Sequence, residues 1–176
     1  ASLRKPLLEL LEYARERKAV TIYLPGFRPE LCSRITRVMP SILENLEFAD
    51  IVMARESDML KIFGKSDPEE CYDEHISFYC RNFIFTSGNL DIYLRTQSEK
   101  LRIEHTSHVP ANMLGWNASF CAGFVKGLLD SEASHRPDNL GSDDLRRIVE
   151  LATACAADSI TTGENVVSEE FVKTLK

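Results

Sequence analysis

The segment with the clearest chemical potential runs from Val109 to Leu129 and reads VPANMLGWNASFCAGFVKGLL. It opens on an irregular turn around Pro110 and continues as a helix rich in small residues. The free N–H groups at the start of a helix converge on one point, and together with the helix dipole they attract anions. The segment is therefore a candidate anion-binding site.

The helix in this segment has one apolar face and one line of small residues. Phe120, Phe124 and Leu128 recur at i, i+4 and i+8, which is the spacing of one helix face. Gly123 and Gly127 lie four residues apart on a neighbouring line. Because glycine costs a helix about 1 kcal/mol relative to alanine, two of them predict close packing against another backbone.

The same segment resembles the signature of the ribokinase-like (PfkB) sugar and nucleoside kinases, in which a D-T-x-G-A-G-D-x-F-x-x-G-F pattern begins this helix. Phe120, Gly123 and Phe124 match the F-x-x-G-F part, and Gly115 matches the first glycine of G-A-G-D. The resemblance implies that the helix N-terminus binds the phosphoryl group of ATP.

The rest of the segment departs from the signature. Asn112 replaces the first aspartate, Trp116 and Asn117 replace A-G, and Ala118 stands where the catalytic aspartate is expected to accept the substrate proton. Alanine cannot accept a proton. The indole of Trp116 would either crowd a phosphate or serve as a core aromatic at the helix start. The resemblance thus implies nucleotide or anion contacts at Gly115, Trp116 and Asn117, and no catalytic residue.

A second motif follows the expected strand 51–54. In adenosine kinases and their relatives, an N-x-x-E motif at this place helps to organise magnesium and phosphate. Here Arg55 replaces the asparagine and Asp58 keeps the carboxylate, so the resemblance implies an indirect role of Asp58 in binding Mg²⁺. The alternative is that Glu56 and Asp58 only stabilise a helix N-terminus, where carboxylates are favoured.

A third motif follows the expected strand 82–85. Thr86 and Gly88 match a T-x-G pattern that lies close to the nucleotide in the family. A glycine after a strand ordinarily marks only a turn. The order of the three motifs along the chain gives this match its weight.

The elements around these motifs alternate between helix and strand. We expect strands at 20–24, 51–54 and 82–85, a hairpin of 91–95 with 101–106, and helices at 5–18, 29–38, 56–63, 67–75, 142–160 and after 168. Pro40 should end the second helix. This order predicts an α/β fold with a mainly parallel sheet. The resemblance implies a ribokinase-like three-layer sandwich with helices on both faces, of which residues 1–176 form the C-terminal nucleotide-binding portion as a single domain.

Length, net charge and cysteine pattern exclude some classes of protein. A chain of 176 residues with 44% hydrophobic content suits one globular domain. A net charge of -6 argues against nucleic acid, and no apolar run is long enough to span a membrane. The five cysteines form no C-x-x-C pair, so we expect reduced thiols in a cytoplasmic protein.

The resemblance covers only the C-terminal part of the family's fold. The N-terminal part, with its substrate-binding segment and lid strands, has no counterpart in this sequence. Its absence should leave a parallel strand unpaired and an apolar face uncovered, and open sheet edges pair with other chains. We expect the N-terminal half or another copy to cover this edge, with a homo-oligomer as the predicted state.

Three functions compete. The strand sequence ADIV and its surroundings resemble the adenosine-kinase branch, but Arg55, Asn117 and Ala118 together predict a catalytically degenerate domain with a binding or scaffolding role. The alternative is the nucleotide-binding portion of an active ATP- and Mg²⁺-dependent adenosine or sugar kinase, with Asp91 or Asp130 as the base. The third is an interaction domain that no longer binds nucleotide.

Overall fold

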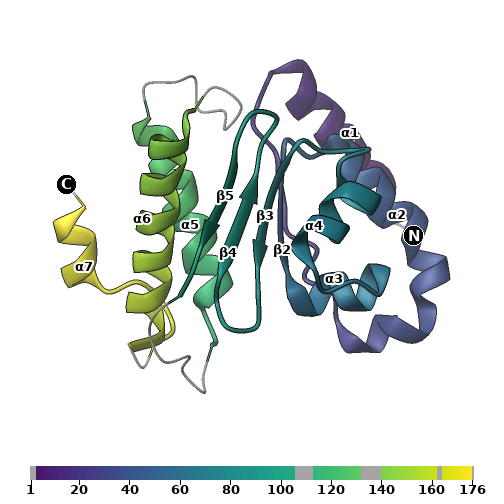
Figure 1. Ribbon diagram of the computed structural model, residues 1–176. Helices are drawn as coiled ribbons and strands as arrows, with labels where there is room; N and C mark the ends of the chain where they lie inside the picture. Colours follow the sequence, from purple (N-terminus) through teal and green to yellow (C-terminus); the bar gives the residue numbers. More distant parts are fainter. Residues whose placement is uncertain (1–2, 106–112, 132–139, 162–163, 176) are drawn as a thin grey trace. The chain divides into compact units, whose positions relative to one another are not determined.

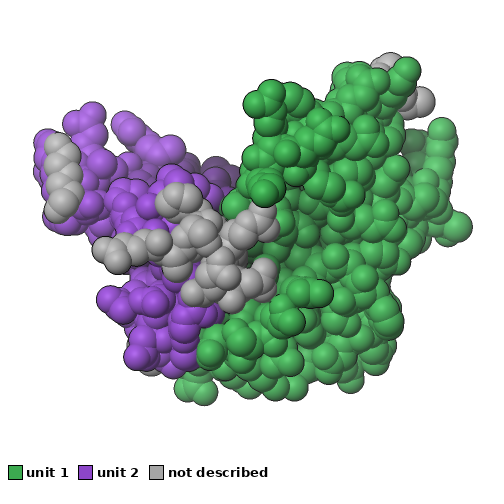
Figure 2. All heavy atoms as spheres, turned by 90° about the horizontal axis from the view of Figure 1, so that it is seen from above, with its two compact units in different colours: residues 1–104 green, residues 105–176 purple. Residues whose placement is uncertain are grey.

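A computed structural model describes residues 3–105, 113–131, 140–161 and 164–175. The chain divides into two compact units, residues 1–104 and residues 105–176, which are coloured separately in Figure 2. The single domain expected over residues 1–176 stays a prediction. Asn112 and most of the polar segment before residue 142 lie outside the described residues.

The first unit contains a five-stranded mixed sheet (Figure 1). The strands lie in the sheet in the order in which they follow in the chain. They are β1 (Ile22–Tyr23), β2 (Ile51–Arg55), β3 (Asn82–Thr86), β4 (Ile92–Arg95) and β5 (Lys100–Ile103). The first three strands are parallel, whereas β4 is antiparallel to both β3 and β5. The expected parallel strands and hairpin are therefore confirmed, although β1 is shorter than the predicted strand 20–24.

The helices of this unit are α1 (Arg4–Glu16), the 3₁₀ helix η1 (Pro29–Arg34), α2 (Ile35–Phe48), α3 (Glu56–Phe63), α4 (Pro68–Cys71) and the π-helical turn η2 (Tyr72–Ile76). Gly64 ends α3 in the left-handed conformation, with φ of 72°. Asp67 caps α4, because its side chain accepts hydrogen bonds from the backbone N–H groups of Glu69 and Glu70. Both boundaries agree with the sequence prediction.

The prediction that Pro40 ends a helix is wrong. The chain forms η1 up to Arg34 and then α2, which continues through Pro40 to Phe48. A proline inside a helix costs about 3 kcal/mol. Burial of Ile42 and Leu46, the apolar residues that α2 presents to the core, offsets this cost.

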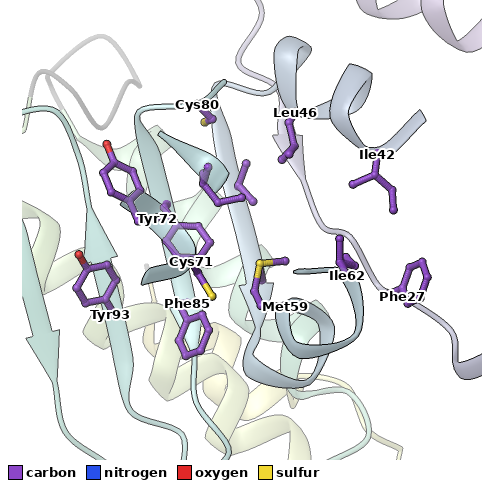
Figure 3. Packing of buried hydrophobic residues seen from close by; sticks show 14 residues of the cluster. Phe27, Ile42, Leu46, Met59, Ile62, Cys71, Tyr72, Cys80, Phe85 and Tyr93 are labelled. Atoms are coloured by element: carbon purple, nitrogen blue, oxygen red, sulfur yellow. The ribbon is translucent and has the colours of Figure 1, made fainter. Parts of the chain in front are cut away.

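The core of the first unit lies between one face of the sheet and helices α2, α3 and α4 (Figure 3). The sheet contributes alternate residues such as Val52, Phe83 and Phe85, and the helices contribute Leu46 and Met59. Residues of the opposite face are also buried, among them Ile51, Ile84 and Leu94. Strands buried on both faces are typical of an α/β sheet.

The second unit is helical and consists of α5 (Trp116–Asp130), α6 (Ser142–Thr161) and α7 (Glu169–Thr174). A Cβ atom on Gly123 would lie 2.8 Å from the Cα atom of Ala152 in α6. One on Gly127 would lie 3.0 Å from Ile148. The two glycines therefore let α5 and α6 approach closely, as their spacing predicts. No helix in the described parts of the chain is both long and apolar enough to cross a membrane.

This packing leads to a stability prediction for Gly123→Ala. The new methyl group collides with Ala152 and Cys155, so we expect a loss of ~1–3 kcal/mol in the free energy of unfolding, despite the better helix propensity of alanine. Urea denaturation followed by circular dichroism measures it. Ala122→Leu, at the exposed neighbouring position, is the control and should change stability by less than about 0.5 kcal/mol. Equal stability of both variants would contradict the close packing.

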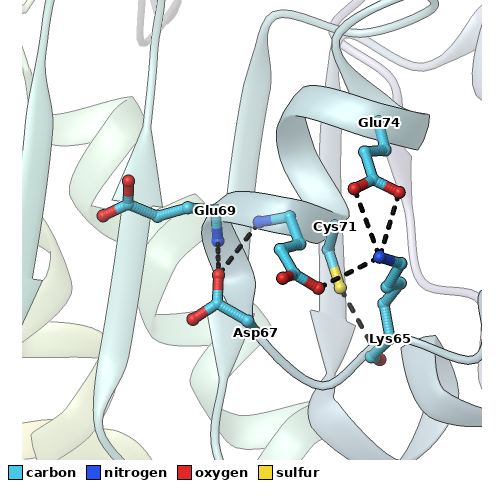
Figure 4. A network of polar contacts seen from close by, with 6 residues as sticks. Lys65, Asp67, Glu69, Cys71 and Glu74 are labelled. Carbon is cyan, nitrogen blue, oxygen red and sulfur yellow. Dashed lines mark hydrogen bonds and ion pairs between the residues drawn. The ribbon is translucent and has the colours of Figure 1, made fainter.

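A polar network holds the start of α4 against η2 (Figure 4). The Nζ atom of Lys65 lies 3.1 Å from carboxylate oxygens of both Glu70 and Glu74. The buried Cys71 thiol donates to the backbone carbonyl of Lys65 at a sulfur–oxygen distance of 3.7 Å. Cys71 therefore lies in an apolar environment next to negative charges.

Burial, with smaller contributions from Asp67 and Glu70, raises the pKa of the Cys71 thiol to about 12. The folded chain thus holds this proton more tightly than the unfolded chain, whose thiol has a pKa of about 8.5. The associated stability is complete below that value and is lost as pH rises toward 12. Above pH ~9, the free energy of unfolding should therefore fall less steeply with pH in Cys71→Ala than in the wild type. Urea denaturation at several pH values measures this difference. Cys32→Ala, which removes an exposed thiol instead of a buried one, is the control. A Cys71→Ala protein with the wild-type decline would contradict the prediction.

Candidate functional site

The carboxylate of Asp58 is buried at the start of α3, where its residue is 2% exposed. It accepts hydrogen bonds from Nε and Nη2 of Arg55, at 2.8 and 2.9 Å, and from the backbone N–H of Phe27 at 3.1 Å. The Asp58 hydrogen bond raises the pKa of the Arg55 guanidinium. Both carboxylate oxygens are therefore used inside the first unit.

This geometry gives Asp58 a structural role. Arg55 already supplies a positive charge at the place where the sequence resemblance implies magnesium. Among the described residues, no three His, Cys, Asp or Glu side chains group to hold a metal ion. The indirect Mg²⁺ role of Asp58 stays a prediction, as does the alternative that Glu56 and Asp58 only stabilise a helix N-terminus.

The second and third motifs meet at the ends of two parallel strands. Arg55 of β2 and Thr86 of β3 are paired in register. Just beyond them, the backbone N–H of Gly88 donates to Oε2 of Glu56 at 2.7 Å. Ligands of open α/β sheets bind at the carboxyl ends of parallel strands. The structure thus brings Thr86, Gly88 and the start of α3 together at such an edge, through a contact with Glu56 that the sequence did not predict.

A pocket of about 200 Å³ opens beside this edge. Its charged lining residues are Glu56, Asp67, Asp91 and Arg102. Three carboxylates against one guanidinium disfavour a phosphate group there. Asp91 lies 3.8 Å from Arg102 and accepts a hydrogen bond from the Asn89 amide, so this candidate base is already held by its neighbours.

In the second unit, the N-terminus of α5 has the form expected of an anion site. Gly115 precedes the helix with φ of 91°, and a Cβ atom there would lie 2.3 Å from the carbonyl oxygen of Asn165. The N-cap residue Gly115 has no side chain that could cap the helix. Between described residues, no hydrogen bond involves the backbone N–H of Asn117 or Ala118. N–H groups in the first turn of a helix have no partner within the helix, and such groups can bind an anion.

The side chains around this helix start take different positions. Trp116 is 2% exposed and packs edge-on against His105, with 6.2 Å between ring centroids. This burial favours a core aromatic over an indole that fills a phosphate site. Asn117 is half-buried, and Ala118 is exposed in the first turn, where an aspartate could reach a ligand. The second candidate base, Asp130, lies at the other end of α5 and pairs with Lys126.

Comparison with known proteins identifies the family. A sequence model described as pfkB family carbohydrate kinase matches residues 1–170. The chain belongs to the pfkB family of carbohydrate kinases. A search of curated proteins finds no match.

Solved structures confirm the ribokinase-like α/β fold of this pfkB-family chain. Aminoimidazole riboside kinase from Salmonella enterica, complexed with aminoimidazole riboside and an ATP analog, matches with a TM-score of 0.75 at 15% identity, over 97% of this chain and 57% of its own. A double-mutant fructokinase from Vibrio cholerae O395, bound to fructose, ADP and potassium ion, matches with a TM-score of 0.79 at 16% identity, over 98% and 56%. This pfkB-family chain thus spans little more than half the length of these structures.

The Asp58 geometry leads to a prediction for Asp58→Asn. The amide keeps the size of the side chain but loses the charge, and one of its atoms becomes a donor facing Arg55 and the Phe27 N–H. We expect a loss of ~1–3 kcal/mol in the free energy of unfolding, measured by urea denaturation. Asp73→Asn, at an exposed position of η2, is the matched control and should stay within about 0.5 kcal/mol of wild type. An Asp58→Asn protein as stable as wild type would show that Asp58 is not a structural carboxylate.

Proposed function

We propose that this chain is a nucleotide-binding, catalytically degenerate member of the pfkB family, with a binding or scaffolding role. One observation carries the proposal. The first turn of α5 carries no carboxylate, and its N–H groups at Asn117 and Ala118 bond to no other described residue, yet the side chain of Ala118 cannot accept a proton. An anion can bind at such a site, but a hydroxyl group is not activated there.

The proposed ligand is ATP, with its phosphates at the N-terminus of α5. Support comes from the related folds, which are solved with an ATP analog and with ADP. Thr86 and Gly88 of the T-x-G motif are further proposed contacts. The Gly88 N–H, however, already donates to Glu56. We therefore propose that Gly88 contacts the nucleotide without donating a hydrogen bond to it.

The phosphate acceptor, the cellular location and the partner are also proposals. The structural neighbours are described with a nucleoside in one case and with fructose in another. We take adenosine and fructose as the probes, since the motifs resemble the adenosine-kinase branch. The cysteines are free thiols, which supports a cytoplasmic location. The partner proposed for the open sheet edge is the remaining half of the fold or another copy.

The test is a thermal-melt and calorimetric titration with ATP, with and without Mg²⁺. At a concentration of 100 times its dissociation constant, ATP should stabilise the chain by about 2.7 kcal/mol. Asn117→Asp places a negative charge at the N-terminus of α5 and should weaken ATP binding by roughly tenfold or more. The same charge favours the first turn of α5, so a weaker affinity would not reflect unfolding.

Gln97→Glu is the matched control, because it adds one negative charge at the exposed β4–β5 turn. It should leave the ATP affinity unchanged. Turnover of ATP with adenosine or fructose should be absent for all three proteins. No melt shift with millimolar ATP would refute nucleotide binding, and measurable phosphorylation would refute the loss of catalysis.

A further inference from the structure

The carboxylate of Glu56 occupies a backbone donor just beyond the carboxyl end of β3. Glu56 is the first residue of α3, and its Oε2 atom lies 2.7 Å from the backbone nitrogen of Gly88 in the β3–β4 turn. This distance is typical of a charge-assisted hydrogen bond. The contact is exposed and joins residues 32 positions apart, so it is a feature of the fold and not of the local sequence.

The β3–β4 turn holds this donor in place. The N–H of Ser87 donates to the Asp91 carbonyl, and the N–H of Leu90 donates to the Ser87 carbonyl, both at 3.0 Å. The Gly88 N–H takes no part in these bonds and reaches another element instead. Ligands of open α/β sheets bind at the carboxyl ends of the strands. The donor therefore lies where a ligand is expected.

Without Glu56, this donor would attract an oxyanion, because backbone N–H groups of turns bind anions. Glu56 opposes such binding in two ways. Its Oε2 atom already accepts the hydrogen bond, and its negative charge repels a second anion at contact distance. The neighbouring pocket does not compensate this charge, since its described cation, Arg102, lies 3.8 Å from the carboxylate of Asp91.

The other polar groups of this edge suit an uncharged ligand group. Thr86, at the end of β3, is 9% exposed, and no described residue forms a hydrogen bond with its hydroxyl. The Oε1 atom of Glu56 also has no partner among the described residues. Buried polar groups ordinarily have partners. A ligand hydroxyl can donate to a carboxylate oxygen, whereas an ionised phosphate oxygen cannot.

We propose that Glu56 is a specificity-determining residue of this edge, where it accepts a hydrogen bond from a sugar hydroxyl of the ligand and excludes phosphate. An acidic side chain that binds a ribose hydroxyl is a known solution in nucleotide-binding α/β folds. The ligand class is thus a nucleoside or sugar that contacts this edge through a hydroxyl group. The proposal rests on the proposed ligand contacts of Thr86 and Gly88, and is independent of the phosphate site at α5.

The experiment follows the backbone amide signals of the isotope-labelled whole chain in NMR titrations with adenosine and with inorganic phosphate. In the wild type, adenosine should shift the Gly88 signal, and phosphate at the same concentration should not. 2′,3′-Dideoxyadenosine, which lacks two of the ring hydroxyls, should bind roughly tenfold more weakly than adenosine, because the carboxylate loses its donor.

Two variants separate the charge of Glu56 from its length. Glu56→Ala frees the Gly88 N–H, so phosphate should now shift the Gly88 signal and the affinity for adenosine should fall roughly tenfold. Glu56→Gln keeps the length of the side chain without its charge and should also admit phosphate. Glu30→Ala is the matched control, because it removes one exposed carboxylate from the first turn of η1, and both responses should remain those of the wild type.

A wild-type Gly88 signal that moves with phosphate, or that does not move with adenosine, would overturn the proposal. A Glu56→Ala chain that still excludes phosphate would overturn it as well. The Asn117 and Ala118 signals report on α5 in a parallel titration with ATP. If they stay unmoved while Gly88 responds as expected, only the proposed phosphate site fails. If they move while Gly88 does not, only the role of Glu56 fails.

Discussion

The buried carboxylate of Asp58 holds together the segments at the C-terminal ends of the parallel strands. A charge that is removed from water must find donors inside the protein. Arg55 and the Phe27 N–H supply them, so one side chain ties the end of β2, the start of α3 and the loop before η1. Because the cation is part of the chain, the positive charge at this edge is permanent. A metal ion would have to compete with a bidentate guanidinium.

The two units differ in the charge they present to an anion. At the strand ends of the first unit, Glu56, Asp67 and Asp91 outnumber Arg102 around the pocket. The first turn of α5 in the second unit carries no carboxylate, and the dipole of a helix is positive at its N-terminus. Phosphate binding is therefore favoured in the second unit and disfavoured in the pocket of the first.

The sequence predicted the features that depend on local chemistry. The hairpin, the helix end near residue 63 and the helix start near residue 67 follow from residue type and spacing, and all are present. It failed at Pro40, where burial of a distant face outweighs a local penalty. The contacts of Gly88 with Glu56 and of Gly115 with Asn165 join residues far apart in the sequence. No spacing rule encodes such contacts, so only the fold reveals which side chains occupy the candidate site.

The family signature in α5 separates into residues that the fold requires and residues that only chemistry requires. A side chain at Gly115 would collide with Asn165, and one at Gly123 would collide with Ala152. Both glycines match the signature. Ala118, by contrast, is exposed and has no packing role, and it is the position where the signature's catalytic aspartate is missing. Packing alone accounts for the two matched glycines, whereas an aspartate at position 118 would serve proton transfer and not the fold. The binding role that we propose needs the packing residues of the signature and does not need that proton acceptor.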